Sequence, residues 1–164
     1  MMKPQYITTS EENTQDIQVG EEFVAAVVNA LMRAPTWKNT ALFLTYDEHG
    51  GYYDHVPPPR AITPDSIAPI LEPGDVPARY DRYGFRVPCL VASPYSKPGH
   101  VSSTVYDHTS ILATIEQKWN LPALTRRDAA ANTLTDFIDL AQPPHFRAPA
   151  LLPRPTIWPF SGQR

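Results

Sequence analysis

Proline is the feature of this 164-residue sequence that most limits its regular structure. There are 19 prolines, of which seven fall in residues 57–77 and six in residues 143–159. Proline has no backbone N–H and clashes with the preceding helical turn, so both stretches are unsuited to helices and central strands. We therefore expect a long loop at the first stretch, and irregular or extended tails at residues 1–12 and 143–164.

Two short apolar runs flank the first proline-rich stretch. Residues 40–46 and 86–93 are rich in apolar, aromatic and β-favouring side chains, a pattern typical of strands buried on both faces. The stretch between them is too long for a plain connection in a compact domain, which indicates a functional loop.

Three helices are predicted from apolar side chains at helical spacing. They cover residues 20–34, residues 107–119 and a segment that begins at Thr125 and continues past residue 134. Thr125 and Asp128 form the pattern of a capping box. The order of helices and strands predicts an α/β fold with a mostly parallel sheet. Two strands are too few to close such a sheet, so we expect the fold to be incomplete in this chain.

Composition excludes several classes of function. The net charge is -3 and no Lys/Arg-rich run is present, so a nucleic-acid partner is not expected. Cys89 is the single cysteine, and its apolar neighbours predict a small buried side chain rather than a reactive thiol or a metal ligand. The sequence has neither an N-terminal signal segment nor an apolar stretch of transmembrane length. These features leave its location unassigned.

The strongest candidate for chemistry directly follows the first apolar run. Asp47, Glu48, His49, Asp54 and His55 place five ionisable groups within nine residues. Crowded carboxylates repel each other unless a cation offsets their charge, and such groups gather at metal and catalytic sites. Ligands of open α/β sheets also bind beyond the carboxyl ends of the strands. The alternative is a solvated loop in which Asp54 and His55 are simply paired.

A pair of glycines interrupts this cluster. Gly50 and Gly51 permit a sharp reversal, which can fold Asp54 and His55 back toward the two carboxylates at the strand end. Oxygen ligands without thiolates favour a divalent metal ion such as Mg²⁺, Ca²⁺ or Mn²⁺, whereas Zn²⁺ or Fe becomes suitable if the histidines ligate.

A second candidate lies at the start of the predicted helix 107–119. Asp107 is a good N-cap residue, although a helix N-terminus is also an anion site, and His108 is equally open to both interpretations. His100 and His145 are interpreted as plain surface residues.

Several motifs, in order along the chain, resemble the bacterial phosphoesterase family, which contains non-haemolytic phospholipases C and related acid phosphatases. The resemblance covers roughly residues 13–140. The motifs are Gly20-Glu-Glu-Phe-Val24, Trp37 through Pro59 with its Tyr-Asp-Glu-His-Gly-Gly-Tyr-Tyr-Asp-His core, Tyr83-Gly-Phe-Arg-Val-Pro88, Ser93-Pro-Tyr-Ser-Lys-Pro-Gly99, Tyr106-Asp-His-Thr-Ser110 and Leu124-Thr-Arg-Arg-Asp128.

This resemblance implies an alkaline-phosphatase-like three-layer sandwich, of which residues 1–164 form a single partial domain. It implies hydrolysis of phosphoesters, phospholipids included, by a hydroxyl nucleophile with bound metal. Asp47 and Glu48 are the implied metal ligands. Asp54 and His55 would shape the phosphate pocket or serve the leaving group.

His49 and His108 complete the set of candidate catalytic residues. His49 belongs to the ionisable cluster, and the resemblance implies that a loop equivalent to Asp107 and His108 closes the site.

The sequence also departs from the family pattern. The family's Glu-Asn metal ligands and its Ser or Thr nucleophile belong to an N-terminal half that this chain does not contain. Asn13-Thr14 stands where the family usually has His-Pro. We therefore expect a metal-dependent phosphoester hydrolase that is weakly active or inactive alone, with the missing half as its partner. The alternative is a catalytically inactive remnant that binds metal or a partner through the same loop. Relatives are often exported.

Overall fold

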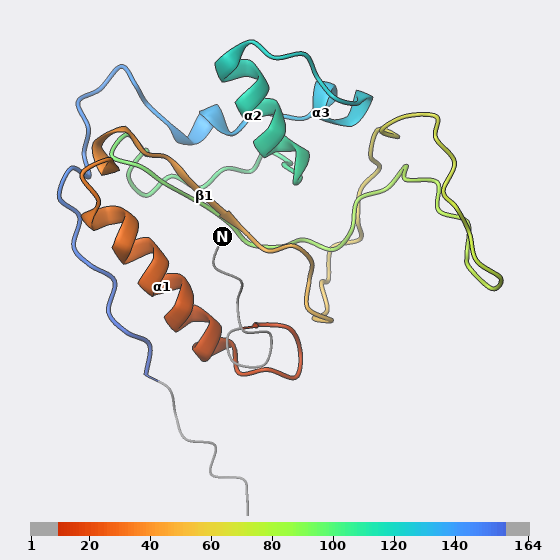
Figure 1. Ribbon diagram of the computed structural model, residues 1–164, viewed down its shortest axis with the longest axis horizontal. Helices are drawn as coiled ribbons and strands as arrows, with labels where there is room; N and C mark the ends of the chain where they lie inside the picture. Colours follow the sequence, from red (N-terminus) through yellow and green to blue (C-terminus); the bar gives the residue numbers. More distant parts are fainter. Residues whose placement is uncertain (1–9, 157–164) are drawn as a thin grey trace, which may run out of the picture.

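The computed structural model describes residues 10–156 and has an α/β arrangement (Figure 1). In this view α1 lies on one side of the strand pair, and α2 and α3 lie on the other. The elements in chain order are α1 (Ile17–Arg33), η1 (Trp37–Asn39), β1 (Leu42–Thr45), β2 (Cys89–Ala92), α2 (Thr109–Trp119), α3 (Arg126–Ala130) and η2 (Leu134–Phe137), the two η elements being 3₁₀ turns.

The predicted helices are present with shifted ends. Helix α1 begins after Asp16, whose side chain accepts the Gln18 amide at 3.0 Å, and ends at Arg33, two residues before Pro35. The capping box of Thr125 and Asp128 is confirmed at the start of α3. The rest of the third prediction is wrong, because α3 ends at Ala130 and the chain then forms η2 instead of continuing the helix.

The two predicted strands pair with each other in antiparallel orientation. Leu42 lies opposite Ala92, and Thr45 lies opposite Cys89. Parallel neighbours need a crossover connection, usually a helix. Here the connection contains no helix and doubles back on itself, so β2 returns against β1. The mostly parallel sheet is therefore not seen in residues 10–156 and remains an expectation.

The strands are not buried on both faces, and that prediction is wrong for this chain. The four residues of β1 are half-buried, Leu90 in β2 is 63% exposed, and Cys89 is exposed rather than buried. Within the described residues the sheet has two strands, so no neighbouring strand covers these side chains. The apolar sequence of the two strands is typical of buried strands, but within the described residues nothing covers both of their faces.

Few apolar side chains of the described residues are buried, and they lie where η2 packs on α2 and where η1 packs on α1. They are Trp37, Ala113 and Leu134, and Leu134 is only 1% exposed. The Leu134 amide donates to Thr114 Oγ1 of α2 at 2.9 Å. The Trp37 ring nitrogen donates to the Phe146 carbonyl at 2.7 Å and so fixes the C-terminal segment. The burial of Leu134 and its bond to Thr114 hold η2 against α2.

The proline-rich loop forms an arm, defined here as residues 60–82, that extends away from the strands (Figure 1). Its base is closed by an antiparallel bridge between Arg60 and Arg82. The Arg127 side chain ties it to α3 by donating to the Ile62 carbonyl at 2.9 Å and to the Tyr80 carbonyl. No helix in residues 10–156 is long and apolar enough to cross a bilayer.

Candidate active site at the end of the first strand

The turn after β1 is built on two glycines with positive φ. Gly50 has φ 63° and Gly51 has φ 77°, a conformation that glycine adopts without the cost other residues incur. The Gly50 carbonyl accepts the Asn13 amide at 3.0 Å. The reversal predicted at Gly50 and Gly51 is confirmed, and the segment before α1 lies against it. Within residues 10–156 it does not gather Asp54 and His55 with Asp47 and Glu48 into one group.

Asp47 and Glu48 are both exposed and follow directly after β1. Asp47 Oδ1 accepts the Glu48 amide at 3.1 Å, and Glu48 Oε2 accepts the Gly50 amide at 3.0 Å. An ionised carboxylate has about four acceptor positions. These backbone bonds shape the turn and leave each carboxylate with capacity for a further ligand.

Asp54 binds a partner that sequence reasoning missed. Arg86 donates from Nε to Oδ2 and from Nη2 to Oδ1, both at 2.8 Å, and the Asp54 side chain is only 10% exposed. The Arg86 side chain, then the Val56 amide, hold the pKa of Asp54 well below its usual range. Asp54 therefore connects the turn to the segment just before β2, which contains Arg86.

His55 follows Asp54 but lies largely in solvent. Its Nδ1 is 3.8 Å from Asp54 Oδ1, and its side chain is 82% exposed. The pairing of Asp54 with His55 considered from the sequence is thus secondary to the bidentate pair with Arg86. Its position leaves the His55 ring accessible to a ligand from outside the chain.

His49 and His108 have ring nitrogens fixed by backbone carbonyls. His49 Nδ1 lies 3.0 Å from the Tyr52 carbonyl, and His108 Nε2 lies 2.7 Å from the Tyr46 carbonyl. Because a carbonyl can only accept, the contacting nitrogen of each ring carries the proton. In the neutral rings, His49 Nε2 and His108 Nδ1 are then free of protons and can accept one.

The second candidate segment approaches the first at the end of β1. Tyr46, whose carbonyl binds His108, immediately precedes Asp47, so this contact brings His108 to the strand end. Asp107 Oδ1 accepts the Thr109 amide at 2.6 Å, but the N-cap of α2 is His108, so Asp107 lies one residue before the cap position. Tyr83 also bonds to Asp107; burial, and then this bond, raise the pKa of Tyr83 to about 12.

The described residues do not form a metal site by themselves. Residues 10–156 bring together no group of three or more His, Cys, Asp or Glu side chains able to hold an ion. Asp47 and Glu48 are adjacent oxygen donors of the type that hard divalent ions prefer, but such ions take six or more ligands. These two residues fit such an ion only as part of a larger ligand set.

His100 is exposed, as the sequence predicts, but sequence reasoning missed the partner of its ring. Its Nε2 lies 2.6 Å from Asp136 Oδ1. The two residues are 36 positions apart, and no local spacing signals their contact. Tyr46 was missed as well: its hydroxyl donates to Glu11 at 2.5 Å, and burial, then this bond, raise its pKa to about 12.

Comparison with known proteins decides the family. The model of the phosphoesterase family matches residues 1–122, a range that contains the turn, both strands and His108. The chain belongs to the phosphoesterase family. The resemblance predicted from the sequence motifs is thereby confirmed.

The relatives of this phosphoesterase chain include plant and bacterial proteins. It is 37% identical over 150 residues to non-specific phospholipase C1 of Arabidopsis thaliana, covering 85% of this chain and 28% of the relative. It is 33% identical over 156 residues to phospholipase C A of Mycobacterium tuberculosis, covering 88% of this chain and 30% of the relative. The chain thus spans less than a third of the length of these relatives.

Proposed function

We propose that this chain is the C-terminal part of the catalytic domain of a phosphoester hydrolase of the phospholipase C and acid phosphatase type. The observation that carries the proposal is the turn at the end of β1, with two exposed carboxylates and His108 beside it, inside the region matched by the phosphoesterase family. The substrate is a phosphoester or a phospholipid, since the relatives are named phospholipases C. The complete fold is a three-layer sandwich with a mostly parallel sheet.

Asp47 and Glu48 supply two ligands of a divalent metal ion, with Mg²⁺, Ca²⁺ or Mn²⁺ favoured over Zn²⁺ or Fe. Support comes from their exposure and from the local bonds that leave each carboxylate able to accept more. When bound, the ion provides the Lewis acid that polarises phosphoryl oxygens. The remaining ligands and the nucleophile come from sequence beyond this chain, so the chain alone is weakly active or inactive.

The histidines handle protons in this proposal. His108 is held by the Tyr46 carbonyl with Nδ1 available, and His49 is held by the Tyr52 carbonyl with Nε2 available. Either nitrogen can take up or return a proton at the leaving oxygen or the nucleophile. Asp54 and Arg86 keep the turn in place, and the exposed His55 faces incoming phosphate.

The test uses this chain alone and joined behind the N-terminal portion of Arabidopsis thaliana non-specific phospholipase C1, called here the completed enzyme. Hydrolysis of p-nitrophenyl phosphate and phosphatidylcholine is measured with and without Mg²⁺, Mn²⁺ or Ca²⁺. We expect metal-dependent turnover by the completed enzyme that Asp47→Asn removes. The absence of such turnover in a folded completed enzyme would reject the proposal.

The matched control is Asp65→Asn. Asp65 also accepts a backbone amide two residues on, that of Ile67 at 2.7 Å, but it lies in the arm rather than in the turn. Its substitution should leave turnover unchanged. Calorimetric binding of a divalent ion by the chain without hydrolysis by the completed enzyme would instead favour the alternative, a metal-binding or partner-binding module.

A further inference from the structure

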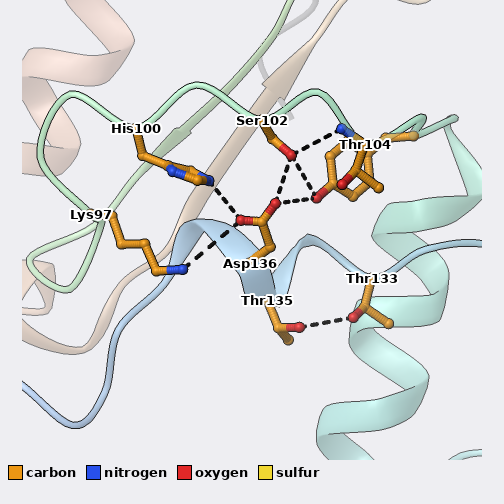
Figure 2. A network of polar contacts seen from close by, with 8 residues as sticks. Lys97, His100, Ser102, Thr104, Thr133, Thr135 and Asp136 are labelled. Atoms are coloured by element: carbon orange, nitrogen blue, oxygen red, sulfur yellow. Dashed lines mark hydrogen bonds and ion pairs between the residues drawn. The ribbon is translucent and has the colours of Figure 1, made fainter.

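A network of polar contacts converges on Asp136, which lies in η2 (Figure 2). Asp136 Oδ1 contacts His100 Nε2 at 2.6 Å and Lys97 Nζ at 4.0 Å. Asp136 Oδ2 accepts the hydroxyls of Ser102 at 2.6 Å and Tyr106 at 2.8 Å. All four partners belong to the single segment 97–106. One carboxylate therefore fixes this segment at several points.

These contacts keep Asp136 ionised. The hydroxyls of Ser102 and Tyr106, followed by His100, lower the pKa of Asp136 to about 2. Hydrogen bonds to a charged acceptor are roughly twice as strong as neutral ones. The aromatic rings add packing, since His100 and Tyr106 have ring centroids 5.4 and 5.6 Å from that of Phe137. Both polar and apolar contacts thus hold the segment to η2.

The base of the network is itself fixed. Leu134, at the start of η2, is buried and bonded to α2. The Lys97 amide donates to the Phe137 carbonyl at 2.9 Å, and the Asp139 amide donates to the Tyr95 carbonyl at 2.9 Å. Segment 97–106 contains no helix or strand, so its conformation depends on such tertiary contacts.

The segment leads directly into the candidate site. Tyr106 is followed by Asp107 and His108, and His108 binds the carbonyl of Tyr46 next to Asp47. On the basis of the proposed function, we propose that Asp136 is a positioning residue: it fixes segment 97–106 and thereby sets where His108 stands at the end of β1. Asp136 acts through this segment and does not touch the reacting groups.

The principal test uses two single variants, Asp136→Ala and Tyr106→Phe. Tyr106→Phe removes one hydroxyl and keeps the ring, so it tests the network if Asp136→Ala does not fold. The imidazole NMR signals of His108 and the amide exchange of Thr109 and Ser110 are followed in this chain. We expect the His108 signals to shift in both variants, and exchange to rise about tenfold in Asp136→Ala, the equivalent of one charge-assisted bond.

The control is Thr135→Ala, also in η2, whose hydroxyl bonds to Thr133 rather than to the segment (Figure 2). It should leave the His108 signals unchanged. If the melting temperature falls in Asp136→Ala or Tyr106→Phe while the His108 signals and exchange stay as in the parent, Asp136 only stabilises the fold and the proposal is overturned.

These readouts need no substrate, so they stand apart from the proposed function. In the completed enzyme, Asp136→Ala should lower kcat at least severalfold with KM nearly unchanged, because His108 is displaced while the two carboxylates at the strand end remain. Shifted His108 signals without any phosphoesterase activity in the parent would support the positioning role and reject the function. An unchanged kcat in an active enzyme would reject the catalytic consequence of the positioning.

Discussion

In the turn after β1, the carboxylates of Asp47 and Glu48 bind backbone amides one and two residues away. In the network around η2, the carboxylate of Asp136 binds side chains 30 to 39 residues away. The first pair is exposed and keeps free acceptor positions, whereas Asp136 has both oxygens engaged by donors. The same chemical group holds the fold around η2, whereas in the turn it stays open to the metal ion that we propose.

The first prediction sharpens this comparison at the turn. In the completed enzyme, Glu48→Gln should lower kcat/KM by at least about a hundredfold, because a neutral ligand holds and tunes a metal less well. Its free energy of unfolding should change by less than about 0.5 kcal/mol, as for an exposed surface position. Steady-state kinetics and urea denaturation measure the two effects. If Glu48→Gln lowers both the free energy of unfolding and kcat/KM, Glu48 stabilises the fold instead of binding a metal ion.

The second prediction concerns the most buried carboxylate of the helical region. Asp128 is 2% exposed and accepts the amides of Leu124 at 2.6 Å and Thr125 at 2.7 Å. Asp128→Ala should cost about 2–3 kcal/mol, because it removes the capping box and leaves buried donors unpaired. Urea denaturation of this chain measures the loss. The control, Asp139→Ala, removes a carboxylate that accepts one local amide, that of Ala141, and should cost less.

The third prediction concerns how the stability of the fold depends on pH through Asp136 and Asp128. The pKa of Asp136 is lowered to about 2, mainly by Ser102 and Tyr106. For Asp128, burial raises the pKa, but the bonds from Thr125, Leu124, Glu116 and its own backbone together lower it to about 2. A lowered pKa stabilises the fold above the unfolded value of about 4, and this contribution is lost as pH falls toward 2. Thermal melting from pH 7 to pH 2 should show this acid loss.

The groups facing these two aspartates qualify the pH prediction. Lys97, His100 and Tyr106 face Asp136. Glu116 faces Asp128, and burial, then Asp128, raise its pKa, so its own contribution is lost as pH rises. Asp136→Asn should flatten the acid part of the curve. If the melting temperature of Asp136→Asn and of Asp128→Asn falls with pH as steeply as that of the parent, other carboxylates cause the loss of stability in acid.

The smallest effect is expected on the exposed face of β2. Leu90→Thr should change the free energy of unfolding of this chain by less than about 0.5 kcal/mol, since the side chain is already in solvent and threonine suits a strand. Leu134→Ala, by contrast, should cost about 2–5 kcal/mol. Urea denaturation compares the two. A loss above about 1 kcal/mol for Leu90→Thr would mean that something covers this face in solution.

The sequence predicts the features whose bonds are local. The period of α1, the capping box of Thr125 and Asp128, and the reversal at Gly50 and Gly51 all depend on residues within four positions of one another. Such contacts form whenever the local backbone conformation forms, so residue spacing is enough to identify them.

Features that depend on the path of the chain could not be predicted in this way. The pairing of Asp54 with Arg86 spans 32 residues and follows from the antiparallel return of β2. The exposure of Leu90 depends on which strands are present, whereas its apolar character does not. The sequence therefore locates the candidate site but not the long-range contacts that hold it.

The closed base of the arm separates its far end from the rest of this chain. Arg60 and Arg82 pair at the base of the arm, and Arg127 donates to the carbonyls of Ile62 and Tyr80. The far end of the arm, residues 65–78, therefore lies beyond both attachments. A short loop joining residues 64 and 79 would keep both attachments. The part of the arm between these two residues can therefore change in length or sequence without disturbing the turn that carries Asp47.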